Sequence, residues 1–127
     1  MLYGYIHFEN EDFINAKQCY EDAINLYQID GNHPFEGWAL VWLGRILGKM
    51  DLMQKDKAED HILRGVEILK NYQFKPLYSL GYLFLGELYK NRDHKEKAFE
   101  YLKMAEDNFH GMEIDFWLSI TRNYLQK

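Results

Sequence analysis

The segment from Gly44 to Lys49 invites comparison with a phosphate-binding loop, in which glycines and a lysine surround the phosphates of a nucleotide. It is one residue shorter than that motif, and Met50 follows the lysine where the motif has Ser or Thr. The segment also falls inside a predicted helix, where the backbone amides are already hydrogen-bonded. We therefore interpret Gly44 and Gly48 as positions of close helix packing and expect no nucleotide or other cofactor.

Five histidines and one cysteine are the other side chains that often bind metals or carry catalysis. The histidines are His7, His33, His61, His94 and His110. No two of them have the spacing of metal ligands on one helix. Cys19 has only His7 within its predicted hairpin, and no acidic residue is spaced to orient that histidine. We expect surface histidines, a buried structural thiol, no metal site and no enzyme active site.

The charge balance disfavours polyanionic partners. Fifteen Lys and Arg residues against twenty Asp and Glu residues give a formal net charge of -5, which offers no basic surface for nucleic acid or an anionic membrane. No apolar run approaches the roughly 18 residues that span a bilayer, and a lone cysteine cannot form an internal disulfide. We expect a cytoplasmic protein that binds neither nucleic acid nor membrane.

The length of 127 residues, with 47% hydrophobic and 17% aromatic residues, suits one domain with a packed core. The chain begins Met-Leu-Tyr-Gly-Tyr-Ile, which lacks the features of a signal peptide and resembles the middle of a helix. We therefore expect residues 1–127 to form a single domain that is a fragment of a longer protein.

An internal repeat organises the chain. Phe35–Leu47 aligns without a gap on Leu77–Tyr89, at an offset of 42 residues that places Gly44 over Gly86. Small residues such as Ala98 recur in the segments that follow. Gly and Ala let two antiparallel helices approach closely where they cross. The spacing therefore predicts helical hairpins, each burying an apolar stripe.

The expected fold is all-α. Apolar periodicity and turn signals predict helices near residues 1–8, 11–28, 35–49, 55–72, 76–91, 94–110 and 113–126. Turns are predicted at Asp30–Pro34 and at Lys75-Pro76, where each proline suits a first helical turn. Asp93 and Glu96 form a predicted capping box for the helix that follows them.

Leu85, Gly86, Tyr89, Ala98 and Ala105 resemble the signature of tetratricopeptide repeats. That family has a Leu-Gly pair and then an aromatic residue in the first helix, with Ala, aromatic and Ala in the second. The resemblance covers the whole chain and implies a right-handed stack of antiparallel helical hairpins, a tetratricopeptide-like α-solenoid of about two and a half repeats plus a C-terminal helix. The repeats are expected near residues 1–30, 34–73 and 76–110, with the terminal helix at 113–126.

The repeat length is similar to a narrower branch of the family. A period of 40 to 42 residues exceeds the usual length of about 34 and resembles the long repeats of bacterial signalling proteins. Leu85–Tyr89, Phe109–Met112 and Trp117-Leu118 are similar to the C-terminal repeats of bacterial multidomain ATPases, some with cyclase or kinase domains. This resemblance implies a scaffold or regulatory segment that binds another protein or a peptide.

The first helix of each hairpin lines the concave face in a stack of this kind. We expect one side of these helices to pack internally and the other side to present an apolar, aromatic-rich surface to the partner. The predicted partner-binding residues are Tyr5, Phe8, Trp38, Val41, Trp42, Arg45, Leu80, Leu83, Phe84 and Glu87. Family members that clamp a terminal carboxylate carry Lys, Arg and Asn in such places. This chain has Tyr5, Trp42, Leu80 and Phe84 there, so carboxylate recognition is not expected.

Two other interpretations of this apolar surface stay open at the level of sequence. Neighbouring helices of the same chain cover it, or a second copy of the chain covers it and the segment is a homo-oligomerisation domain. Large exposed apolar patches mark interaction sites without identifying the partner. A protein or peptide partner is the first expectation, with a homodimer as the alternative.

Overall fold

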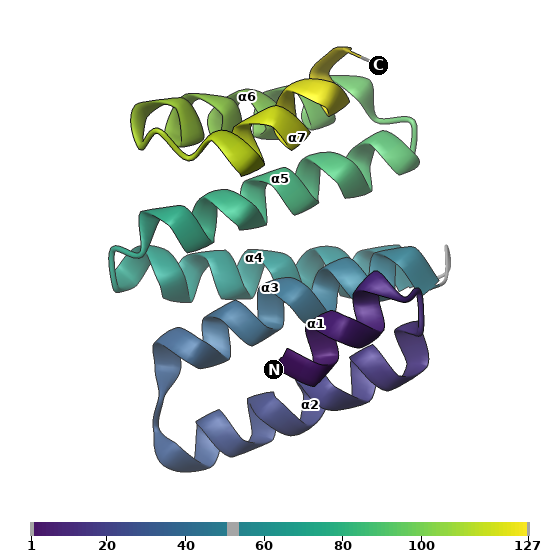
Figure 1. Ribbon diagram of the computed structural model, residues 1–127, viewed down its shortest axis with the longest axis vertical. Coiled ribbons are helices and arrows are strands. Elements are labelled where there is room, and N and C mark those ends of the chain that lie inside the picture. The colour runs from purple at the N-terminus through teal and green to yellow at the C-terminus, as the bar shows by residue number, and fades with distance from the viewer. Residues whose placement is uncertain (1, 51–53, 127) are drawn as a thin grey trace.

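The fold is built from α-helices (Figure 1), and the computed structural model describes residues 2–50 and 54–126. The helices are α1 (Leu2–Glu9), α2 (Phe13–Asp30), α3 (His33–Met50), α4 (Lys55–Asn71), α5 (Lys75–Asn91), α6 (Lys95–Gly111) and α7 (Asp115–Gln126). No described residue belongs to a β-strand, which confirms the all-α prediction. Residue 1 of the first predicted helix lies outside the described residues. Within the described ranges, no helix has the length and apolar character needed to cross a membrane.

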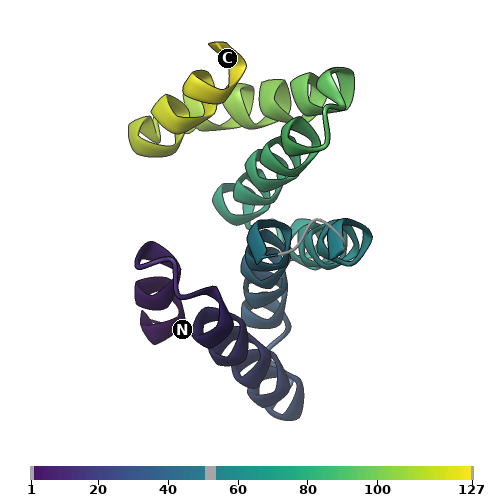
Figure 2. The same ribbon diagram turned by 90° about the vertical axis from the view of Figure 1, so that its right-hand side faces the viewer.

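The helices follow one another along the long axis of the molecule (Figure 1), and each packs against the next one in the chain. In addition, α3 contacts α5, and α5 contacts α7. Figure 2 shows α1 and α7 on one side of the molecule and α4 on the opposite side. The row of helices therefore curves around the side on which α1 and α7 lie, and this side is called the concave side below.

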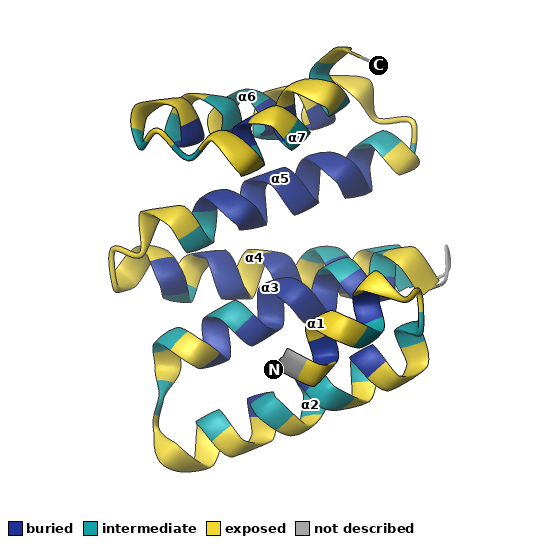
Figure 3. Ribbon diagram, in the orientation of Figure 1, coloured by how far each residue is buried: buried dark blue, intermediate teal, exposed yellow. Residues whose placement is uncertain are grey.

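The middle helices α3 and α5 form the core. Every residue of α5 from Ser79 to Tyr89 is buried, and α3 is buried at most positions from Glu36 to Leu47, as the dark blue ribbons of Figure 3 show. A helix that is apolar around its whole circumference is stable in water only when other elements surround it. The long apolar runs of these two helices therefore require neighbours on all sides.

Small residues set the close helix crossings, as the sequence predicted. A Cβ atom on Gly44 of α3 would lie 2.4 Å from Cγ1 of Ile62 and 2.7 Å from the carbonyl oxygen of Ala58, both in α4. A Cβ atom on Gly86 of α5 would lie 2.5 Å from Cγ of Leu102 in α6. The backbones of α3 and α4 therefore approach too closely for a Cβ atom at Gly44, and at Gly86 the Leu102 side chain fills the space that a Cβ atom would need.

The predicted capping box at Asp93 is wrong. Asp93 has a positive φ of 60° and lies in the turn that ends α5, where the amide of His94 donates to the carbonyl oxygen of Tyr89 at 2.9 Å. The N-terminal cap of α6 is therefore His94, whose side chain makes no capping hydrogen bond. This left-handed residue closes the preceding helix, so Asp93 is one position too early to cap the next one.

Candidate functional site

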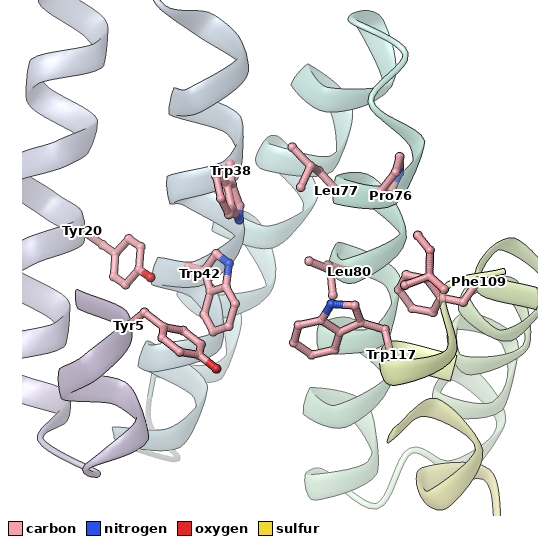
Figure 4. Close-up of a pocket in the computed structure, with 10 residues that line it drawn as sticks. Tyr5, Tyr20, Trp38, Trp42, Pro76, Leu77, Leu80, Phe109 and Trp117 are labelled. Atoms are coloured by element: carbon pink, nitrogen blue, oxygen red, sulfur yellow. The ribbon is translucent and has the colours of Figure 1, made fainter. Parts of the chain in front are cut away.

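A groove of about 600 Å³ lies on the concave side between α1 and α7 (Figure 4). It is lined by Tyr5 of α1, Tyr20 of α2, Trp38 and Trp42 of α3, Pro76, Leu77 and Leu80 of α5, Phe109 of α6, Ile114 before α7, and Trp117 of α7. All of these side chains are apolar or aromatic, and none is charged at neutral pH. The groove therefore offers mainly apolar contact area, and the indole N–H of Trp38 is buried rather than open to a ligand.

An aromatic cluster connects the helices around the groove. Its centre is Trp42, which is only 4% exposed and packs edge-to-face against three rings. The ring centroids are 5.8 Å away for Tyr5, 5.6 Å for Phe8 and 5.0 Å for Phe84. Phe84 in turn lies 6.4 Å from Trp117 of α7. Edge-to-face pairs of this kind are favourable, so the cluster holds α1, α3, α5 and α7 together.

Arg45 of α3 lies between aromatic rings, one of which, Trp42, lines the groove. Its guanidinium carbon is 4.6 Å from the ring centroid of Phe8, 4.4 Å from that of Phe84 and 5.3 Å from that of Trp42. A cation above the faces of aromatic rings is attracted by their quadrupoles. The side chain that the sequence assigned to a partner thus makes its contacts within the chain.

Glu87 of α5 is the anion that pairs with Arg45, and its side chain is only 5% exposed. The Arg45 Nε and terminal nitrogen donate to the two carboxylate oxygens at 3.2 and 3.3 Å. Lys49 of α3 lies 3.5 Å from the same carboxylate, and the hydroxyl of Tyr124 in α7 donates to it. One buried carboxylate therefore connects three helices of the concave side.

The charge state of this network follows from its surroundings. Burial raises the pKa of Glu87, but the charge and hydrogen bonds of Arg45, together with Lys49 and the Tyr124 hydroxyl, bring the net pKa below its ordinary value. Burial and the negative charge of Glu87 raise the pKa of Tyr124. At neutral pH Glu87 is therefore ionised, and Tyr124 is the protonated donor.

Four of the ten predicted partner-binding residues line the groove: Tyr5, Trp38, Trp42 and Leu80. The other six do not, namely Phe8, Val41, Arg45, Leu83, Phe84 and Glu87. Whether any of them contacts a partner stays a prediction.

The expected exposure of this face is wrong for most of these residues. Phe8, Val41, Trp42, Leu80, Leu83, Phe84 and Glu87 are all buried in the single chain. The physical reason is that α3 and α5 contact each other directly, while α1 and α7 cover them on the concave side. The alternative interpretation, in which neighbouring helices of the same chain cover the apolar face, is correct for these positions. The groove that remains open is smaller than the predicted surface.

No protein-family model, curated protein or solved structure matches this chain. The resemblance to tetratricopeptide repeats therefore stays a prediction. The groove and the buried Arg45–Glu87 network are the structural basis of the proposed function.

Six groove residues were not predicted as site residues: Tyr20, Pro76, Leu77, Phe109, Ile114 and Trp117. They come from α2, α5, α6, α7 and the turn before α7, so no single periodic pattern groups them. Only Trp117 could have been predicted as a site residue from the sequence, because a large aromatic residue in the last amphipathic helix must face either the core or a partner. The remaining five could be assigned only once the helix packing was known.

The histidines and the cysteine differ in part from expectation. His33, His94 and His110 are exposed, whereas His7 and His61 are half-buried. Nδ1 of His7 lies 3.3 Å from the Asp12 carboxylate, an acidic neighbour that the sequence spacing did not predict. Cys19 is half-buried rather than buried. In the part of the chain that the structure describes, no three His, Cys, Asp or Glu side chains are placed to hold a metal ion.

Proposed function

We propose that this chain is a protein-interaction module that binds an apolar polypeptide segment in the concave groove. The observation that supports this most is a groove of about 600 Å³ lined by ten side chains that are all apolar or aromatic. Concave apolar sites of this size are the usual places for ligands. Within the groove, Tyr5 is exposed and Trp38, Leu77 and Trp117 are half-buried, so these side chains are accessible to a bound segment.

A polypeptide fits this lining because of the residue types. Trp38, Trp42 and Trp117 supply large rigid rings, and tryptophan and tyrosine are the residues that most often dominate protein interfaces. A charge buried against these rings would lose its hydration without gaining a partner. The bound segment should therefore place two or three large uncharged side chains in the groove and keep its own charges outside it.

The proposed architecture behind this function is a right-handed stack of tetratricopeptide-like hairpins. The order of the helices, the close crossings at Gly44 and Gly86 and the position of α1 and α7 on the concave side support it. By resemblance alone, we further propose a scaffold or regulatory role within a bacterial cytoplasmic signalling protein. Catalysis is not part of the proposal.

A peptide-library selection on the whole 127-residue chain tests the proposal. Leu77 is half-buried in the groove, and Leu77→Lys should weaken the selected peptides at least about tenfold, because it puts a charge in an apolar site. Leu63 is an exposed leucine of α4 outside the groove, so Leu63→Lys is the matched control and should bind as the wild type does.

The contradicting outcomes are equally concrete. Selected peptides that bind Leu77→Lys as tightly as the wild type would show that the groove is not their site. If no peptide binds and light scattering gives about twice the monomer mass of 15.3 kDa, with Leu77→Lys restoring the monomer, the groove serves self-association instead.

A further inference from the structure

Helix α7 supplies one side of the groove, and its position determines how wide the groove is. Trp117 of α7 faces Trp38 and Trp42 of α3 across the opening (Figure 4), and Ile114 just before α7 also lines the groove. The opposite side belongs to α1 and α3, which are far away in the sequence. A small rotation or shift of α7 would therefore change the shape of the site more than any local change in its floor.

The contacts of α7 with α6 fix only part of its position. Leu118 and Thr121 are buried, and Arg122 Nε pairs with the Glu106 carboxylate of α6 at 3.2 Å. These contacts hold α7 on its chain neighbour. Toward α5, Trp117 also packs against Phe84, with 6.4 Å between the ring centroids.

Tyr124 makes the polar contacts that connect α7 to α5. Its hydroxyl donates to Oε2 of Glu87, and its backbone carbonyl accepts from Nζ of Lys90, both residues of α5. Glu87 also accepts from Arg45 of α3. A hydrogen bond to a buried charged acceptor is stronger than one between neutral groups, and this acceptor is itself held in place by α3.

We propose that the Tyr124 hydroxyl, acting through Glu87, is the positioning contact that holds α7 so that Trp117 stands in the side of the groove. Tyr124 does not line the groove and acts only through α7. A buried hydrogen bond would thus control the width of the groove. The expected effect on binding rests on the proposed function.

The variant Tyr124→Phe tests this because it keeps the ring and removes only the hydroxyl. Glu87 retains Arg45 and Lys49, so the fold should survive with unchanged helical circular dichroism. The matched control is Tyr72→Phe, which removes the hydroxyl of an exposed tyrosine at the end of α4, outside the groove.

The first measurement needs no ligand. The chain has three tryptophans, so 5-fluorotryptophan labelling gives three ¹⁹F resonances, which single Trp→Phe variants assign. In Tyr124→Phe we expect the Trp117 resonance to shift or broaden while that of Trp38 stays. Hydrogen exchange in residues 115–126 should become about ten- to a hundredfold faster, the range for losing a hydrogen bond to a charged group. Tyr72→Phe should change neither.

The second measurement uses a peptide selected on the wild-type chain, whose affinity should fall about three- to tenfold in Tyr124→Phe and stay constant in Tyr72→Phe. Unchanged Trp117 signal and unchanged exchange in α7 would overturn the proposal. An altered Trp117 signal with unchanged affinity would also overturn it, because groove width would then not control binding. Failure to select any peptide would refute the proposed function, while the Trp117 resonance still decides whether Tyr124 positions α7.

Discussion

Replacing Glu87 with alanine should destabilise the fold by about 3 to 5 kcal/mol, the usual loss when one partner of a buried ion pair is removed. The Arg45 side chain is 14% exposed, and its guanidinium lies 4.6 Å and 4.4 Å from the ring centroids of Phe8 and Phe84. Those rings attract a cation but cannot accept its in-plane hydrogen bonds. The variant therefore leaves a largely buried charge without its carboxylate partner.

Urea unfolding followed by far-ultraviolet circular dichroism measures this loss as a lower midpoint at constant slope. The paired variant Arg45→Met with Glu87→Leu removes both charges and should recover most of the stability, because apolar replacement of a whole buried pair is often neutral. A loss below about 1 kcal/mol for Glu87→Ala, as for an exposed pair, would refute the reasoning. So would a double variant no more stable than the single one.

Three further outcomes are expected. Gly44→Ala should lower the melting temperature, since the added methyl would lie 2.7 Å from the carbonyl oxygen of Ala58, whereas Gly111→Ala meets nothing within 4 Å and should not. Trp42→Ala should lower the free energy of unfolding by about 3 to 5 kcal/mol through a cavity, with helical circular dichroism retained. The pKa of Glu87 is lower in the folded state than its ordinary value of 4.5, so its contribution to the free energy of unfolding should be complete above pH 4.5 and should be lost as the pH falls below that value. In urea unfolding measured at several pH values, Glu87→Gln should therefore lose less stability in acid than the wild type does.

The helices and their close crossings could be predicted from the sequence because both depend on local spacing. The alignment that places Gly44 over Gly86 identified two of the close crossings before any packing was known. The turns were harder to predict from the sequence, as Asp93 shows. An aspartate three residues before a glutamate fits a capping box equally well whether it begins one helix or ends the previous one, and only its φ of 60° decides.

The candidate site could be predicted only in part, because burial depends on what surrounds a helix. Trp42 and Phe84 lie opposite the small residues of α3 and α5, which made them look like an open surface. Yet α5 is apolar on nearly every side from Ser79 to Tyr89, and such a helix needs cover all around. That criterion, applied to the sequence, would have favoured burial for Trp42 and Phe84 and left Tyr5 and Trp38 as the more accessible aromatic residues.

The internal pairing of Arg45 with Glu87 determines what kind of groove is left. These two residues lie 42 positions apart, the same offset as the repeat, so they occupy equivalent places in α3 and α5, and their opposite charges meet between these helices. A solvent-exposed pair at this point would have made the site a clamp for charged groups. Because the carboxylate and guanidinium instead pair with each other, neither of them lines the groove, whose ten lining side chains are uncharged. Under the proposed function, recognition in this groove depends on the shape and apolar area of the bound segment, and the role proposed for Tyr124 acts through the same carboxylate.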